Sequence, residues 1–397
     1  MILFLVLGLY EWRRNREFDG AVRAFQEDRL KEGQELILHY LKTRPNHAAA
    51  HLLAARMDRL LGNYPGAENH LNECKRLEGM TGDLQLEWLL LRAVRGEYAE
   101  VEKSLKQLLA DQHPRSDLIL ETLVHCQLGV LRYNSAMDYL QTWLKKEPDS
   151  VRALHLRAFV WERLGSRDQS QDDYARALEL APGNRQVRLA LLGLLLTDKN
   201  IQEAAEHLAL LKNNPHHEPA ELMVLARFEL LQGNQEEAQK YLDELLAKKP
   251  DHAEALFEQG MLATDPVQAE AFFRKALTGN ENFLQARYQL YSLLLRENRK
   301  KEAEAEKAKY LAFREDWERL PNLLAEADRL ASPDLLADAA AILVRGGDNQ
   351  GAQLLFRALH LNPRHKRSHE LLAVFFEKTN QPDKAAHHRE RAAVKSP

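Results

Sequence analysis

Apolar side chains recur along this chain at helical spacing, in short segments that polar turns separate. Leu154 and Trp161 share one face of a predicted helix, and Leu222 and Leu225 do the same in a later segment. A stripe of this kind can be buried only by a neighbouring helix. The pattern therefore predicts short amphipathic helices that pack against one another in pairs.

The predicted helix pairs repeat with a fixed period. Pro148 and Pro182 end equivalent segments and stand 34 residues apart, and most steps between units are of similar length. Similar units begin near Arg14, Ala48, Gly82, Asp117, Val151, Arg185, Pro219, Ala253, Leu284, Ser332 and Lys366. A fixed period in this range is the mark of a repeat architecture, so we expect one continuous array of helix–turn–helix units.

Small residues and helix-ending residues stand at fixed places in each unit. Where the two helices would cross, a bulky side chain would force their axes apart. The residues at the crossing are Ala55 with Ala67, Ala158 with Ser170, and Ala226 with Ala238. The turn inside a unit carries a glycine, which adopts the left-handed conformation at a helix end without strain. These glycines are Gly62, Gly96, Gly165, Gly233 and Gly346. Prolines end the second helices, because proline lacks the N–H donor. They are Pro45, Pro148, Pro182, Pro250 and Pro363.

In this arrangement the chain resembles the tetratricopeptide-repeat family. The residues that carry the resemblance are clearest in Ala48–Gly79, Val151–Asn184, Pro219–His252 and Ser332–His365, and the repeats cover nearly the whole chain. The resemblance implies an all-α, right-handed superhelical solenoid of about ten or eleven units. We expect the main array over residues 17–317 and further units with a polar cap over 332–397.

Two places break the rhythm of the repeats. The unit from Ala253 to Phe283 is short, because its turn is reduced to Thr264, Asp265 and Pro266. The unit from Leu284 runs into a long charged helix, and residues 318–331 then predict an irregular extra helix before the repeat resumes. We expect a kink or a subdomain boundary near residues 312–332.

The first sixteen residues form an apolar run, MILFLVLGLY, followed by a basic and aromatic segment. The run is about half the ~20 apolar residues that a spanning helix needs. It also lacks the basic residues that precede the apolar part of a secretory signal. We expect a membrane anchor whose start is trimmed; the alternatives are an interfacial segment and a helix packed on the first repeat. The basic cluster favours repeats in the cytoplasm, although residues upstream would change that orientation.

The charge balance excludes a bulk electrostatic attraction to nucleic acid. The chain has 55 Lys and Arg residues against 59 Asp and Glu, a net charge of −4, so we expect no nucleic-acid partner. The only two cysteines, Cys74 and Cys126, stand far apart without a CxxC partner. They form neither a disulfide framework nor a zinc site, and they leave the compartment undetermined.

The sequence holds no motif for catalysis. It has no glycine-rich phosphate loop, no GxSxG and no HExxH, so we expect no enzymatic activity and no cofactor. Histidines cluster at residues 216–217, at 387–388 and at His365 with His369. No set of Cys or carboxylate residues accompanies them at ligand spacing, so we interpret them as solvated helix ends and predict no metal site.

The family resemblance places the binding surface on the concave wall of the first helices, which holds an extended or helical peptide. The residues at the matching places are Arg56, Arg59, Glu87, Glu121, His125, Arg152, His155, Phe159, Met223, Arg227, Phe257, Met261 and Tyr288. Methionine and aromatic side chains in the later half can adapt to different ligands. The alternative for each residue is the exposed face of a solvated helix.

Two subtypes of the family can be compared residue by residue. Chaperone-docking members share a clamp of Lys, Asn and Arg for two carboxylates, but the matching places hold residues such as Leu52, Leu86 and Thr122. The apolar run ahead of the repeats is similar to bacterial, membrane-anchored regulators of lipopolysaccharide assembly, whose CxxC zinc module this sequence lacks. The partner expected is therefore a protein or peptide of mixed character.

The leading hypothesis is an interaction scaffold or adaptor that binds a peptide or partner protein on its concave face. One alternative is a structural or assembly factor, a membrane-associated spacer or self-associating array without a ligand in the groove. The other is the regulatory half of an enzyme whose catalytic part is on a separate chain or a missing segment.

Overall fold

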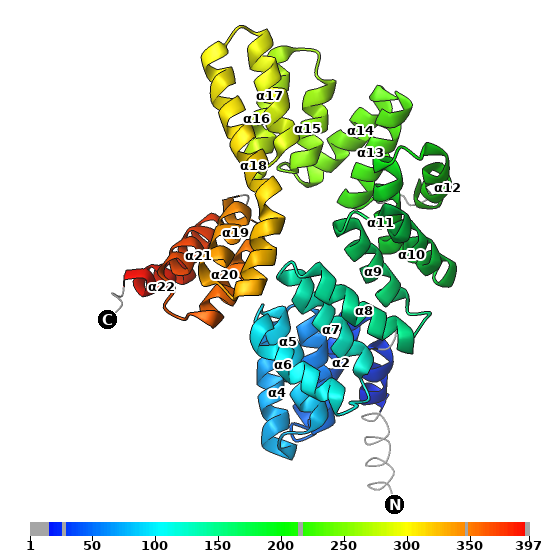
Figure 1. The fold of residues 1–397 in the computed structure, drawn as a ribbon. Coiled ribbons are helices and arrows are strands. Elements are labelled where there is room, and N and C mark those ends of the chain that lie inside the picture. Colours follow the sequence, from blue (N-terminus) through cyan, green and yellow to red (C-terminus); the bar gives the residue numbers. More distant parts are fainter. Residues whose placement is uncertain (1–15, 26–28, 213–216, 346–347, 394–397) are drawn as a thin grey trace, which may run out of the picture. The chain divides into compact units, whose positions relative to one another are not determined.

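The computed structural model describes residues 16–25, 29–212, 217–345 and 348–393, and all regular secondary structure in these ranges is helical (Figure 1). Residues 16–25 form a helix that packs against α2. The first helices of the later pairs are α3 (Ala48–Leu60), α5 (Gly82–Val94), α7 (Ser116–Gly129), α9 (Val151–Arg163), α11 (Arg185–Thr197), α13 (Pro219–Gln232), α15 (Ala253–Leu262), α17 (Leu284–Arg296), α19 (Pro333–Arg345) and α21 (Lys366–Lys378). The second helices are α2 (Leu30–Thr43), α4 (Tyr64–Glu78), α6 (Tyr98–Ala110), α8 (Tyr133–Lys146), α10 (Arg167–Leu180), α12 (Ile201–Lys212), α14 (Gln235–Lys248), α16 (Pro266–Gly279), α18 (Lys300–Leu330), α20 (Asn349–Leu361) and α22 (Pro382–Ala393).

The predicted all-α array of helix pairs is confirmed. From Ala48 onward, each first helix begins at the predicted residue or one residue away from it, including the short pair that starts at Ala253. Each helix packs on helices of its own pair and of the neighbouring pairs, and the closest packing lies within pairs such as α3–α4, α9–α10 and α19–α20. This is the neighbour-to-neighbour packing that defines a solenoid.

The pair α9–α10 shows how the sequence specifies one unit. Ser150 caps α9 by accepting the Ala153 N–H, and Gly165 takes a φ of 79° in the turn that follows the helix. Ser170 is fully buried at the helix crossing, where its hydroxyl donates to the Ala158 carbonyl at 2.9 Å. A small polar residue therefore replaces alanine at the crossing without leaving an unpaired hydroxyl.

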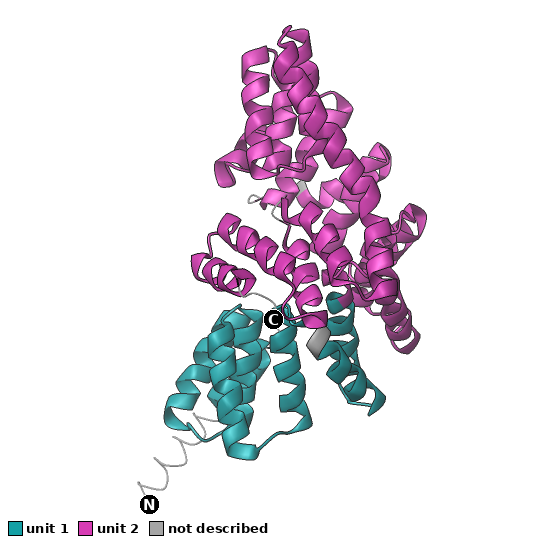
Figure 2. Cartoon of the chain, turned by 60° about the vertical axis from the view of Figure 1, so that its left-hand side comes forward, with its two compact units in different colours: residues 1–126 teal, residues 127–397 magenta. Residues whose placement is uncertain are grey.

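The chain divides into two compact units, residues 1–126 and 127–397 (Figure 2). The boundary falls inside α7 rather than near residues 312–332, where the sequence predicts one. The expected irregular extra helix at 318–331 is also not a separate element, because α18 runs without interruption from Lys300 to Leu330 and includes Pro321.

Packing explains why α18 continues through its proline. Phe313, Leu320, Leu323 and Ala327 are all buried, and their helical spacing is unbroken on both sides of Pro321. Proline removes one backbone hydrogen bond, but this face buries several side chains that only a continuous helix would align.

Polar contacts hold the second half of α18 inside unit 2. The Asp328 carboxylate accepts from Arg132 Nε at 3.1 Å, just before α8, and also pairs with Arg357 of α20. Nearby, Gln350 Nε2 donates to the Leu128 carbonyl at 3.2 Å. These contacts join segments about two hundred residues apart, so the long helix is fixed by tertiary contacts as well as by its neighbours in sequence.

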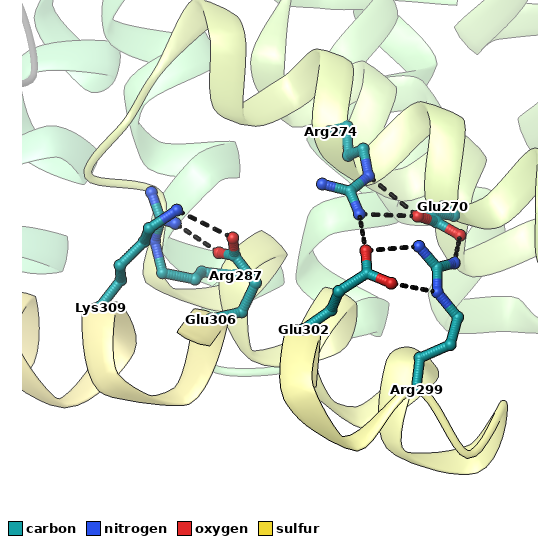
Figure 3. Close-up of polar contacts among 7 residues, drawn as sticks. All are labelled: Glu270, Arg274, Arg287, Arg299, Glu302, Glu306 and Lys309. Atoms are coloured by element: carbon teal, nitrogen blue, oxygen red, sulfur yellow. Dashed lines mark hydrogen bonds and ion pairs between the residues drawn. The ribbon is translucent and has the colours of Figure 1, made fainter. Parts of the chain in front are cut away.

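A second group of ion pairs connects α16 with the start of α18 (Figure 3). Glu270 of α16 accepts from Arg299 at 2.5 Å and from Arg274 at 2.9 Å, and Glu302 accepts from the same Arg299 at 2.8 Å. This cluster is partly exposed, so solvent screens it and its contribution to stability is small. Its alternating signs fix the register of α18 on the preceding pair.

None of the helices within the described residues combines the length and the apolarity that crossing a bilayer requires. The apolar run of the predicted membrane segment lies in residues 1–15, outside the described residues. Membrane attachment through this segment therefore stays a prediction.

Two glycines inside first helices test the packing at the helix crossings. Gly260 of α15 occupies the same place as Ala158 and Ala226, and a Cβ there would lie 2.6 Å from the Phe273 ring. We expect Gly260→Ala to lower the free energy of unfolding by about 1–3 kcal/mol, because the aromatic ring must move.

The matched control is Gly193→Ala in α11, where a Cβ would meet no atom within 4 Å. Alanine there should raise the free energy of unfolding by about 0.5–1 kcal/mol through its better helix propensity. Urea unfolding followed by circular dichroism measures both. Equal effects of the two substitutions would contradict the crossing-site argument.

Candidate functional site

In unit 1, the structure brings three of the predicted groove residues together. Glu87 of α5 accepts from Arg56 Nε at 2.7 Å and from Arg59 Nε at 3.3 Å, and both arginines belong to α3. The Glu87 side chain is almost fully buried, and two arginines compensate its charge. The carboxylate is therefore part of the contact between repeats, and only the arginine edges remain open to a ligand.

Glu121 and His125 lie one turn apart on α7. His125 Nε2 is 4.0 Å from Glu121 Oε1, and the histidine is exposed while the glutamate is buried. Of the two predicted residues, His125 is the one that a ligand can reach.

In unit 2, the predicted residues of α9 form a short stripe. Arg152 is exposed, the His155 ring packs 5.8 Å from the Tyr174 ring, and the Arg163 guanidinium lies over Phe159 at 4.9 Å. Burial lowers the pKa of His155 below its ordinary value, so this ring is neutral at physiological pH. The stripe presents an arginine beside a neutral aromatic surface.

Successive first helices α13, α15 and α17 carry the remaining predicted residues, and the structure separates them by burial. Met223 is buried in the contact with α14 and is not available to a ligand, which corrects its assignment to the groove. Phe257 is partly buried between Phe273 and Phe283. In contrast, Met261 and Tyr288 expose 48% and 46% of their surface.

Charged side chains border these exposed residues. Arg227 of α13 is partly exposed and donates to Glu254 of α15 at 3.0 Å. Glu258, one turn after Glu254, is half-buried; burial raises its pKa, and the nearby Arg227 partly offsets the effect. We call Arg227, Glu254, Glu258, Met261 and Tyr288 the α13–α17 surface.

Sequence reasoning missed four residues on or near this surface: Glu254, Glu258, Tyr310 and Arg314. Glu254 stands at the same place in its unit as Arg152, so the repeat alignment held the signal for it. Tyr310 lies on the second helix α18, with its ring 5.6 Å from Tyr288, and Arg314 lies over Tyr310 at 5.9 Å. Reading only first helices could not have found these two.

The histidines do not all lie at solvated helix ends, as the sequence suggested. His369 of α21 and His388 of α22 are 5% and 9% exposed, and their Nδ1 atoms are 2.9 Å apart, at hydrogen-bonding distance. The prediction failed because His369 faces the second helix of its own pair. Among the described residues, no group of three or more His, Cys, Asp or Glu side chains could hold a metal ion.

Sequence models of the tetratricopeptide repeat match residues 160–218 and 219–262, which include α11 and α13. This chain contains tetratricopeptide repeats. The two matches are consecutive, and they include Met223, Arg227, Phe257 and Met261. Tetratricopeptide repeats serve in general as scaffolds for protein–protein interaction.

Solved structures with a similar fold come from several organisms. The human IFIT1 dimer with PPP-AAAA is 16% identical, over 87% of this chain and 90% of that chain, with a TM-score of 0.46. PilF of Pseudomonas aeruginosa is 14% identical, over 63% and 98%, with a TM-score of 0.36. The thermophilic protein TTC0263 of Thermus thermophilus is 18% identical, over 46% and 99%, with a TM-score of 0.41. Likeness at this level carries no function from those proteins to this chain.

The cluster in unit 1 yields a prediction about stability. Glu87→Gln keeps the shape of the side chain but leaves two arginines close together without a compensating charge. We expect the free energy of unfolding to fall by about 2–4 kcal/mol, as for a buried ion pair that loses one partner.

The control for this prediction is Glu73→Gln, which removes the exposed i,i+3 pair with Arg76 on α4. Its effect should stay within about 0.5 kcal/mol. Both are measured by urea unfolding; a Glu87→Gln protein as stable as the control would show that Glu87 does not hold the two repeats together.

Proposed function

We propose that this chain is an interaction scaffold that binds a peptide segment of a partner protein on the first helices of its repeats. The α13–α17 surface is the main contact region. The observation that carries the proposal is the exposure of Met261 and Tyr288 on neighbouring first helices. Exposed methionine and aromatic side chains are typical of the anchors in binding surfaces.

The charges around the anchors indicate the character of the peptide. Arg227 and Glu254 already pair with each other. The half-buried Glu258, one turn after Glu254, has a raised pKa. A peptide with an apolar or aromatic residue for Met261 and Tyr288 and a basic residue for Glu258 complements this surface. A basic residue would favour the charged form of Glu258 on binding.

The proposal contains no chemical step. The sequence offers no catalytic motif, and the candidate residues provide a binding surface of mixed charge. A net charge of −4 also supports a protein partner over a nucleic acid.

The proposal is tested with a peptide display library selected on the full chain. Met261→Glu combined with Tyr288→Glu should weaken the selected peptides by about 10-fold or more, because a buried carboxylate replaces an apolar anchor. Dissociation constants measured by fluorescence anisotropy give the result.

The matched control carries Leu210→Glu and Val267→Glu, which replace exposed apolar residues on the second helices α12 and α16. It should bind the peptides as the unchanged chain does. Peptides whose affinity resists the first variant, or falls equally with the control, would overturn the assignment of the binding surface.

A further inference from the structure

Four repeats carry a polar side chain at the same buried place in the first helix. In each repeat, that side chain binds the backbone carbonyl six residues earlier and the side chain nineteen residues later, on the second helix. The sets are Pro45, His51 and His70; Pro182, Arg188 and His207; Glu281, Arg287 and Glu306; and Pro363, His369 and His388. The contact ties the loop before the repeat to both of its helices, so we call it the interhelix clamp.

The clamp differs in chemistry from repeat to repeat. In the ninth pair, Arg287 Nη1 donates to Glu306 Oε2 at 2.6 Å in an ion pair (Figure 3). In the tenth pair, Leu336 and Leu355 occupy the two places and are buried, without a polar contact between them. In the last pair, two histidines occupy them, so the contact depends on where the protons are.

The geometry fixes the protons of the last clamp. His369 Nε2 lies 3.1 Å from the Pro363 carbonyl, which can only accept, so this nitrogen carries a hydrogen. A neutral His369 then accepts at Nδ1, and His388 Nδ1 donates to it across 2.9 Å. Two neutral rings satisfy the contact completely.

The pair has room for one added proton but not for two. If His388 carries its hydrogen on Nε2, its Nδ1 can accept from a protonated His369, whereas a second added proton sets two N–H groups face to face. A charge on His388 would lie among the Phe356 ring of α20 at 6.3 Å, the Phe376 ring of α21 stacked at 5.6 Å, and His387 at 5.3 Å. The other groups whose charges act on the pair, His365 and Arg391, oppose a further positive charge, and Asp334 of α19 binds His365.

The corresponding histidine pair in unit 1 has a different environment. Asp58 Oδ2 lies 3.8 Å from His70 Nε2, and Glu73 also favours a charge on His70. Burial and His51 still lower the pKa of His70, but these carboxylates offset part of the effect. In the last pair, the pKa of His388 is lowered to about 4, so we expect the stronger response to acid there.

We propose that the His369–His388 clamp is a proton-sensitive latch, which holds the helix pair α21–α22 closed at neutral pH and releases it in acid. Release would uncover the face of α20 that carries Phe356, now covered by Phe376 and His388. Because a repeat contacts only its neighbours, the terminal pair can open while the rest of the array stays folded.

The direction of the pH effect follows from burial. Burial lowers the pKa of His388 to about 4 and also lowers the pKa of His369 below its ordinary 6.5. The open state then binds more protons than the closed state, so closure is strongest above pH 6.5 and weakens as the pH falls from 6.5 toward 4. At pH 5, the lowered pKa of His388 alone should raise the equilibrium constant for opening of α21–α22 on the order of 30-fold.

The test is hydrogen exchange with mass spectrometry on the full chain at pH 7.5 and pH 5.0, with intrinsic exchange rates corrected. We expect protection of α21–α22 to fall on the order of 30-fold at pH 5.0. Protection of α13–α14, where Leu222 and Tyr241 hold the clamp places, should stay constant. Unchanged protection of α21–α22 would overturn the latch.

Two variants separate the latch from a general acid effect. His369→Leu with His388→Leu copies the clamp of the tenth pair, and His369→Arg with His388→Glu copies that of the ninth. Each should keep α21–α22 protected equally at both pH values. If the leucine variant does not fold, the Arg–Glu variant still tests the latch. A loss of α21–α22 protection at pH 5.0 as large as in the unchanged chain would refute the proposal.

Discussion

The close approach of the two helices in each pair is the constraint on which the rest of the structure depends. Ala55 and Ala67, Ala226 and Ala238, and Gly260 against Phe273 leave room for little more than a methyl group at the crossing. Because the axes are close there, the large side chains above and below the crossing interdigitate and bury the apolar stripe. Every repeat must meet this condition separately, which is why the small residues recur with the period of the array.

The same constraint explains how much of the fold the sequence could predict. Small residues, turn glycines and terminal prolines act locally, so the starts of the helices could be placed within a residue. The continuation of α18 through Pro321 could not be predicted in this way. The proline costs one backbone hydrogen bond, but burial of Phe313, Leu320 and Leu323 along a continuous helix outweighs that cost. The boundary inside α7 likewise depends on contacts between distant segments, which no local signal records.

The candidate site was less predictable, because exposure depends on how neighbouring repeats stack. Equivalent places on first helices hold Met223, Phe257 and Tyr288, yet the first is buried, the second partly buried and the third exposed. The sequence contains the residue type and its place within the repeat. It does not contain the extent to which a neighbouring helix covers that residue. Glu87 shows the same effect, since two arginines of the preceding repeat cover a carboxylate that the sequence pattern places on an open wall.

Buried polar residues in this chain have a role that exposed ones do not. The exposed pairs around Arg299 are screened by water and can change with little effect on stability. The interhelix clamps lie where water cannot replace a lost partner, so leucine, an arginine–glutamate pair and a histidine pair are different solutions to one packing position. Leucine has no proton to gain, whereas two facing imidazoles lose their contact once both are protonated. The choice of residue at one repeated place can thus give a single unit of a uniform array its own response to pH.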